Sequence, residues 1–315
     1  MNLYSRILVT SAVLVLASAC YSDFALPPSQ IPASGWDVSN GIPGGLPGGI
    51  PDTSSWPVYN VTQAPYDGDN TGATDSSVAI NAAITDAIAD NRTGAIIYLP
   101  AGTYRTESQI DARVSFPRGK QEPFSLVIRG DGLNQTFIEM HHPSGSGYGI
   151  AFRPMAGQNA RSEKIVSGYN RGSTQITVND DIGNYFSVGM SMLISVPNAD
   201  VPDMDADVPA YMGSAIGQLV RITAVDAGAK TISFEPALNN GGYSYTSAVA
   251  QVGINVPYQS GLEDFKIENK NGIGSHSIYM GNPQECWVKG VEVGKTRGWH
   301  IRIDGGFGCI FTENY

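Results

Sequence analysis

Residues 276–280 read HSIYM and residues 299–303 read WHIRI, so a strand-like pattern returns after 23 positions. Cys286 and Cys309 keep the same spacing, and each of them begins a short run of mostly apolar residues. A fixed period in the low twenties, built from short β segments, is typical of a solenoid in which each repeat stacks on the one before. The pattern therefore predicts stacked coils in this part of the chain.

An earlier copy of the repeat lies upstream. Residues 262–267 read LEDFKI and match VKGVEV at 288–293, at an offset of 26 positions. Leucine-rich repeats share such a period, but they need a leucine ladder and an asparagine pattern that this sequence lacks. We therefore expect a mostly β chain whose main body is a parallel β-helix, with two or three short strands in each coil.

One segment has the pattern of an amphipathic helix. Asp75 or Ser76 can cap its start by accepting hydrogen bonds from backbone N–H groups, and residues 91–94 end it. Its apolar residues recur at three- and four-residue spacing and form one stripe: Ile80, Ala83, Ile84, Ala87 and Ile88. The first coil of a parallel stack presents unpaired backbone groups and an apolar end, so we expect this helix to cap it.

Residues 161–253 differ in pattern from the rest of the chain. Alternating or apolar segments at 174–178, 191–196, 219–225 and 231–234 predict short strands. Strands spaced so closely predict a small antiparallel β unit inserted into the main body.

The inserted unit contains an acidic loop with Asp203, Asp205 and Asp207 at alternate positions. Such alternation occurs in loops that bind calcium through carboxylate oxygens. Val208 stands where an EF-hand loop requires glycine, so an ordinary exposed acidic loop is the alternative. Calcium is the one cofactor that the sequence suggests.

The first twenty residues have the pattern of an export signal. Arg6 precedes an apolar run, 7–16, that is too short for a typical membrane span and is followed by small residues. Residues 17–20, Ala-Ser-Ala-Cys, resemble the lipobox of bacterial lipoproteins, although Ala17 stands where leucine is commoner. The resemblance implies a lipid on Cys20, which would hold the protein on the membrane without a spanning helix. Simple secretion and an uncleaved anchor are the alternatives.

Residues 21–58 are rich in proline and glycine and contain IPGGLPGGIP at 42–51. Proline disfavours helix and glycine has no side chain to pack, so this segment predicts a tether between membrane and domain. The alternative is an irregular strap that packs on the domain surface through its Ile and Leu side chains. We expect the protein to be exported, either to the bacterial cell envelope or into the medium.

A longer stretch carries a family resemblance. Residues 66–140 contain IYLPAGTY at 97–104 and IRGDG at 128–132, downstream of the predicted cap helix. This arrangement resembles the N-terminal part of right-handed parallel β-helices of the pectate lyase superfamily, grouped with glycoside hydrolase family 28 and found also in phage tailspikes. One departure is the turn at 68–72, which reads GDNTG where the family usually has Gly-Asp-Gly. The resemblance implies a right-handed β-helix and a polysaccharide as partner.

The resemblance and the repeat divide the main body in two. We expect the cap and the first coils in residues 59–160 and further coils in residues 254–315. The sequence stops at Tyr315, partway through a coil, whereas the family usually has many more coils. We therefore expect this chain to be a fragment.

The repeat also predicts a candidate site. Alternate residues of a strand share a face, so His300, Arg302 and Asp304 should point outward together. Ser277 and Tyr279 should lie one coil below His300 and Arg302, about 4.8 Å away. The residues expected to point inward are Trp299, Ile301 and Ile303.

This patch suits a sugar polymer. Tyr279 can stack on a pyranose face, Arg302 and His300 can bind carboxylate or hydroxyl groups, and Asp304 can act as acid, base or ion ligand. A lyase needs a base for the C5 proton and a cation for the uronate carboxylate, whereas a glycosidase needs two carboxylates. Asp304 and Glu313 are the carboxylates available here, without the paired-aspartate motif of polygalacturonases. The alternative is an ordinary solvated face.

Two function classes follow. The first is a surface or periplasmic enzyme, a lyase or glycoside hydrolase, that degrades a polysaccharide, with a uronate-containing glycan favoured. The second is a non-catalytic glycan-binding or adhesive β-helix module. The net charge of −10 argues against a nucleic-acid partner and repels polyuronates unless calcium or a neutral substrate intervenes. The oligomeric state stays open.

Cys286 and Cys309 occupy equivalent positions in neighbouring coils. Two stacked free thiols are one interpretation of this spacing. A disulfide is the other, because neighbouring strands bring Cα atoms within disulfide range and an exported protein meets an oxidising compartment.

Overall fold

The fold is seen in a computed structural model that describes residues 49–90, 94–112, 125–143, 147–152, 155–180, 182, 185–196, 216–239, 248–255, 257–271, 276–296, 298–304, 306 and 308–315. Within these ranges, none of the helical segments is long and apolar enough to cross a membrane. The predicted lipid site Cys20 and the acidic residues Asp203, Asp205 and Asp207 lie outside the described residues.

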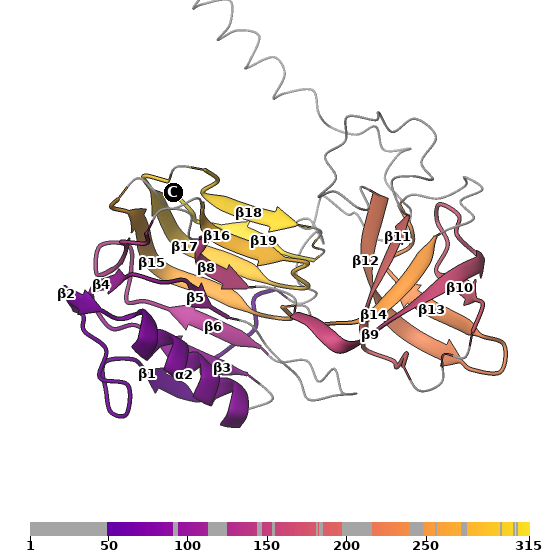
Figure 1. Cartoon of the computed structure of the whole chain (residues 1–315), viewed down its shortest axis with the longest axis horizontal. Helices are drawn as coiled ribbons and strands as arrows, with labels where there is room; N and C mark the ends of the chain where they lie inside the picture. Colours follow the sequence, from indigo (N-terminus) through magenta and orange to yellow (C-terminus); the bar gives the residue numbers. More distant parts are fainter. Residues whose placement is uncertain are drawn as a thin grey trace, which may run out of the picture. The chain divides into compact units, whose positions relative to one another are not determined.

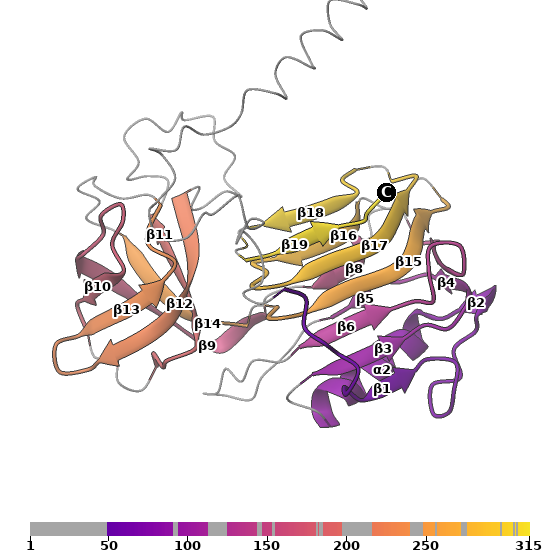
Figure 2. The same ribbon diagram turned by 180° about the vertical axis from the view of Figure 1, so that it is seen from behind.

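The main body is a parallel β-helix, as the repeat predicted, and its strands lie on three faces (Figures 1 and 2). The first face comprises β1 (Val58–Asn60), β3 (Ala95–Tyr98), β6 (Leu126–Arg129), the start of β15 (Gly261–Asn269), the start of β17 (Trp287–Gly294) and β19 (Ile310–Thr312). The second face comprises β2 (Thr71–Asp75), β4 (Gly102–Thr106), β7 (Thr136–Met140) and the ends of β15 and β17. The third face comprises β5 (Ile110–Asp111), β8 (Tyr148–Phe152), β16 (His276–Gly281) and β18 (Ile301–Asp304).

The register of the coils confirms both repeat offsets. Ile278 pairs with Ile301, 23 positions later. Leu262 pairs with Val288, 26 positions later. In Figure 2 the stack rises from β1 and β3 to β18 and β19, and β15 lies directly beside β6 although the inserted unit separates them in sequence.

The longer strands turn a corner where the backbone adopts a left-handed conformation. Asp264, Gly290 and Glu313 have φ values of 60°, 62° and 57°, and they follow one another at the same offsets of 26 and 23 positions. Such values are uncommon for residues other than glycine. The corner bends β15 and β17 from the first face to the second.

The core fills the interior of the coils and is closed by the predicted helix. Helix α2 (Ser77–Asp90) begins where the Asp75 carboxylate accepts a hydrogen bond from the backbone N–H of Ser77, 3.0 Å away. Its buried stripe joins the solenoid core through Ile80, Ala83, Ile84 and Ala87. Burying each isoleucine contributes about 1.5–3 kcal/mol, so the cap covers the apolar end of the first coil.

Residues 49–57 pack on the outside of the first face. Ile50 and Trp56 lie against a small cluster of nearly fully buried side chains, Ile96, Val127 and Trp287. Gly261 makes room for the Trp287 ring, because a Cβ at this glycine would lie 2.2 Å from the indole. We call residues 49–57 the strap. This part of the predicted tether therefore belongs to the folded body.

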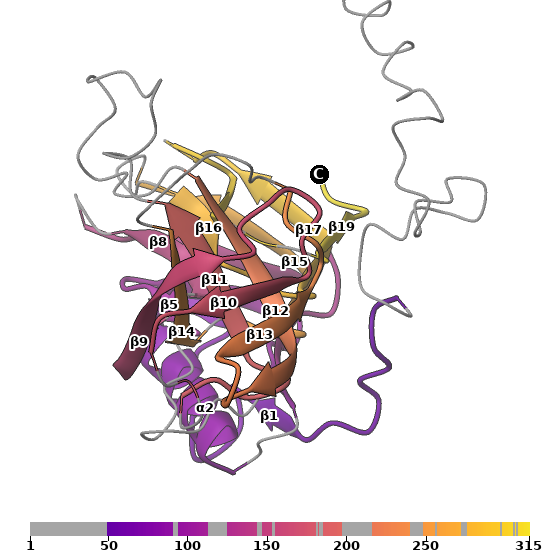
Figure 3. The ribbon, with the colours of Figure 1, turned by 90° about the vertical axis from the view of Figure 1, so that its right-hand side faces the viewer.

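The inserted unit is a closed antiparallel barrel, which confirms the predicted antiparallel unit (Figure 3). The strands follow the order β10-β13-β12-β11-β14-β9 around the barrel. Their bounds are Met155–Ser167 for β9, Gln175–Val178 for β10, Ser191–Val196 for β11, Ile216–Asp226 for β12, Thr231–Glu235 for β13 and Val249–Asn255 for β14. The barrel has an apolar core of its own, which includes Phe186, Ile194 and Phe234.

Candidate functional site

The outer surfaces of the three faces differ in chemistry. On the first face the strap packs on the cluster that contains Trp287. The Trp287 indole N–H donates to Glu263 at 2.7 Å, and Arg129 pairs with the same carboxylate at 2.5 Å. These polar groups are therefore paired within the chain, whereas Val58 and Phe311 of the same face are exposed.

The second face carries ion pairs that run across the coils, which we call the charge ladder. Glu139 of β7 contacts His141 at 3.5 Å and Lys270 at 2.8 Å, and Lys270 also contacts Glu268 at 2.9 Å. The Glu139 hydrogen bond raises the pKa of Lys270, and the Lys270 hydrogen bond lowers the pKa of Glu268. A pocket on this face is lined by Phe137, Ile138, Glu139, Lys266, Glu268 and Lys270. Its two lysines and two glutamates balance in charge, which leaves little net attraction for an ionic ligand.

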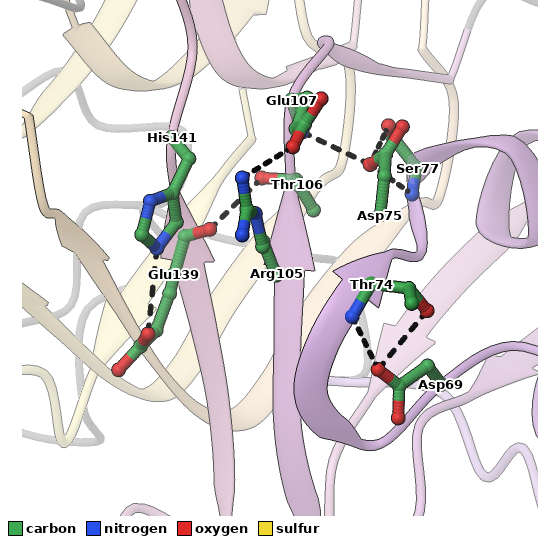
Figure 4. Close-up of polar contacts among 9 residues, drawn as sticks. All are labelled: Asp69, Thr74, Asp75, Ser77, Arg105, Thr106, Glu107, Glu139 and His141. Carbon is green, nitrogen blue, oxygen red and sulfur yellow. Dashed lines mark hydrogen bonds and ion pairs between the residues drawn. The ribbon is translucent and has the colours of Figure 1, made fainter.

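Figure 4 shows where this face meets the cap. Arg105 reaches Glu107 at 2.5 Å, and the backbone N–H of Glu107 donates to Asp75 at 3.0 Å. Asp69 accepts hydrogen bonds from the backbone and hydroxyl groups of Thr74, and its bonds from Thr71 contribute most to lowering its pKa. Asp69 therefore closes the turn at 68–72, which departs from the usual family motif.

The third face presents aromatic side chains from three neighbouring strand segments. The rings of Tyr148 and Tyr279 stack with centroids 4.4 Å apart and planes 17° apart. The rings of His276 and Trp299 stack at 4.4 Å and 24°. The Arg302 guanidinium lies 4.8 Å from the Trp299 ring centroid and 5.6 Å from that of Tyr279. We call these five residues the aromatic platform.

A bidentate ion pair fixes the charged part of the platform. Arg302 donates from Nε to Asp304 Oδ1 at 2.9 Å and pairs through Nη2 with Oδ2 at 2.8 Å. Burial, with the Asp304 charge and hydrogen bond, raises the pKa of Tyr279 to about 12. Burial and the Arg302 charge lower the pKa of His276. At neutral pH the platform therefore combines neutral rings with a charge-balanced Arg–Asp pair.

The structure brings together three of the predicted site residues. Tyr279 and Arg302 are register partners in neighbouring coils, and Asp304 holds Arg302. His300 is exposed and lies one residue before β18. The prediction that Ser277 faces outward is wrong, because Ser277 is fully buried. Ser277 lies beside Trp299 of the next coil, and its backbone N–H donates to the Trp299 carbonyl at 3.2 Å.

The expectation that Trp299 points inward is also wrong. Trp299 is 53% exposed, and it precedes β18, so the alternation of the strand does not extend to it. Ile301 does pack against the core. Ile303 pairs with the buried Met280 and is nevertheless 41% exposed, since β18 is the last strand of the third face within the described residues.

Besides Trp299, which was expected to point inward, two platform residues were missed in the sequence. His276 aligns with Trp299 in the 23-residue repeat, which was a signal available from the sequence. Tyr148 gave no such signal, because the inserted barrel separates it from the strands beside which it lies.

Cys286 and Cys309 are not bonded to each other; they precede the paired residues Trp287 and Ile310, and burial raises the pKa of both thiols. In the part of the chain that the structure describes, His, Cys, Asp and Glu form no group of three or more that could hold a metal ion. The calcium prediction for Asp203, Asp205 and Asp207 concerns residues outside that part.

A parallel β-helix closed by a capping helix is the fold of pectate lyase-like proteins. The family described as rhamnogalacturonase A/epimerase, pectate lyase-like, matches residues 58–299, and the chain belongs to this family. No curated protein matches the sequence.

Several solved structures are similar in fold. The tailspike gp61 of Pseudomonas phage phi297 has 9% identity and a TM-score of 0.49, over 82% of this chain and 49% of that chain. The Gp54 tailspike of Acinetobacter baumannii bacteriophage AP22, solved with a capsular saccharide, has 11% identity and a TM-score of 0.43, over 78% and 43%. A family 28 exopolygalacturonase from Yersinia enterocolitica has 14% identity and a TM-score of 0.33, over 82% and 43%. This chain spans about half the length of these solved chains or less.

Proposed function

We propose that this chain binds a polysaccharide on the aromatic platform and belongs to an enzyme that degrades it. The observation that carries the proposal is the stacked group of Tyr148, Tyr279, His276 and Trp299 with Arg302 beside it. Aromatic rings offer flat apolar surfaces to sugar rings, while polar tips bind hydroxyl groups. The family membership supports a glycan as ligand, and two of the similar structures are an exopolygalacturonase and a tailspike in complex with a capsular saccharide.

The proposed chemistry is that of a lyase or a glycoside hydrolase, with a uronate-containing glycan as the favoured substrate. In a lyase, Arg302 would hold the uronate carboxylate and His300 would take the C5 proton as general base. In a hydrolase, Asp304 would be one of the two carboxylates that the reaction requires. These roles follow from the position of the three residues beside the platform.

The activity is tested with the full-length protein on polygalacturonate and on mannuronan. A lyase releases unsaturated ends that absorb ultraviolet light, and a hydrolase releases reducing ends without that absorbance. Asp304→Asn and Arg302→Ala should abolish either signal, while His141→Asn, on the second face, should retain it. Turnover that survives both platform-side substitutions would place the chemistry elsewhere.

A non-catalytic glycan-binding module is the second candidate, and the Arg302–Asp304 pair favours it. Both carboxylate oxygens of Asp304 contact the guanidinium, at 2.9 and 2.8 Å. A carboxylate whose two oxygens are both engaged by a guanidinium is occupied by that contact and does not point to a substrate. Binding on a glycan array without turnover in either assay would support this candidate over the enzyme.

We also propose that the protein is exported and anchored to the cell envelope through a lipid on Cys20. The support is the apolar run followed by small residues and cysteine. Cys20→Ser should move the protein from the membrane fraction to the soluble fraction and remove incorporation of a labelled fatty acid. Unchanged fractionation of that variant would argue for an uncleaved anchor.

A further inference from the structure

Trp299 is the most exposed ring of the platform, and His276 holds it in two ways. The backbone N–H of Trp299 donates to Nδ1 of His276 at 2.9 Å. The imidazole also stacks on the indole at 4.4 Å. Trp299 lies before the start of β18, and its carbonyl accepts from Ser277 N–H at 3.2 Å. The histidine therefore supplies the acceptor for one of the main-chain hydrogen bonds that set the position of this ring.

We infer that His276 is a positioning residue that keeps Trp299 in the platform only while its imidazole is neutral, so that glycan binding weakens on acidification. A neutral imidazole can accept a hydrogen bond at one ring nitrogen, whereas an imidazolium carries N–H donors at both. Protonation at Nδ1 would oppose the Trp299 N–H donor with a second donor. The inference rests on the proposed binding of glycan at the platform.

The groups facing His276 set the direction of the effect. Arg302 of β18 is a cation near the imidazole and disfavours a second positive charge, although Asp304 balances part of it. Tyr148 of β8 contacts the His276 ring, and Tyr279 has a raised pKa of about 12, so it carries no charge near neutral pH. Burial and Arg302 therefore lower the His276 pKa below 6.5. The hydrogen bond from Trp299 N–H to His276 therefore stabilises the position of Trp299 fully above pH 6.5. This stabilisation is lost as the pH falls through the lowered pKa of His276.

Two substitutions distinguish the role of His276 as a hydrogen-bond acceptor from its role as a stacking ring. His276→Asn places an amide oxygen near the position of Nδ1 and does not titrate. His276→Phe keeps a stacking ring but removes the acceptor. The matched control is His141→Asn, which changes a histidine of the charge ladder on the second face.

The first measurement needs no ligand. Tryptophan emission of the free protein is followed from pH 7.5 to 4.5, and the signal of a Trp299→Phe variant is subtracted. The wild type and His141→Asn should show a transition with a midpoint below pH 6.5. His276→Asn and His276→Phe should show none. The same transition in His276→Asn would overturn the inference.

The second measurement uses polygalacturonate as the probe over the same pH range. Wild-type affinity should fall by up to about tenfold on acidification, as expected for the loss of one hydrogen bond that positions the ring, and His276→Asn affinity should stay level. A histidine-dependent emission change without binding of any glycan would leave the positioning role standing and remove the proposed function. Binding that is independent of pH, together with flat emission, would remove the positioning role alone.

Discussion

Trp299 shows how much of the proposed binding surface depends on one side chain. It is more than half exposed, stacks on His276 and lies against the Arg302 guanidinium. Large exposed aromatic side chains that contact an arginine commonly mark recognition surfaces. At the scale of residues, the platform is a set of rings whose positions are fixed by their neighbours and whose outer surfaces stay open.

Trp299→Ala should weaken glycan binding by roughly tenfold, because it removes one stacking surface and one cation–π partner of Arg302. Isothermal titration with polygalacturonate and mannuronan oligosaccharides measures the change. Tyr185→Ala, which removes an exposed ring from the barrel, is the matched control and should bind like the wild type. Equal affinity of Trp299→Ala and the wild type would place the glycan on another face.

Labelling with a thiol reagent tests whether Cys286 and Cys309 form a disulfide. Burial raises the pKa of both thiols, so the reactive thiolate is scarce at pH 8. In a Cys20→Ser variant, a thiol reagent should label neither residue quickly in the folded protein and should label both after unfolding in denaturant. Absence of labelling after unfolding, with recovery on addition of a reductant, would show that the pair had formed a disulfide.

The coils could be predicted from the sequence because a strand and its turn are local patterns that return at nearly constant spacing. The offsets of 23 and 26 positions in the sequence predict the register of β15 to β19. The cap helix was predictable for the same reason, since its stripe lies within one segment. Alternation failed for Trp299 because it lies before β18, where the pleat of the strand does not extend. It also failed for Ser277, which lies near the start of β16 and is buried. Tyr148 and the charge ladder depend on contacts between coils, and a single coil does not contain that information.

The corner column of Asp264, Gly290 and Glu313 is the element that bends the strands. A Cβ at Gly290 would lie 2.5 Å from Oδ1 of Asp264 and would also sit at a φ of 62°. Two separate costs therefore meet at this glycine, namely a steric clash and a left-handed backbone.

Gly290→Ala should lower the free energy of unfolding by about 1–3 kcal/mol, as overpacking and left-handed strain usually do. Adding Asp264→Gly should recover most of the loss, because it removes the clashing carboxylate and relaxes its own corner. Urea unfolding of both single variants and the double variant gives the coupling. Gly294→Ala is the control, since its nearest neighbour is the flexible Glu268 side chain at 3.4 Å. If the changes in the free energy of unfolding of the two single variants simply add in the double variant, the Asp264 side chain is not the cause of the loss at Gly290.

Within the residues that the structure describes, the two large apolar cores have no residue in common. One fills the solenoid and includes Phe265, and the other fills the barrel and includes Phe234. Each ring is almost fully buried. Separate cores favour separate unfolding, because chains with more than one core often depart from two-state behaviour.

Calorimetry should show two unfolding transitions, one for each core. Phe234→Ala should lower only the barrel transition and Phe265→Ala only the solenoid transition, each through a loss of about 3–5 kcal/mol. The two variants serve as controls for each other. A single transition lowered equally by both would show that the barrel and the solenoid unfold as one unit.

The strap sets an order of events in time. Ile50 and Trp56 pack on a cluster that includes Trp287, more than 200 positions later in the chain. A chain made from its N-terminus presents the strap first, yet the surface that receives it is complete only after β17 has stacked. The earliest described residues of this protein must therefore wait for its late coils, with their apolar side chains uncovered until those coils arrive.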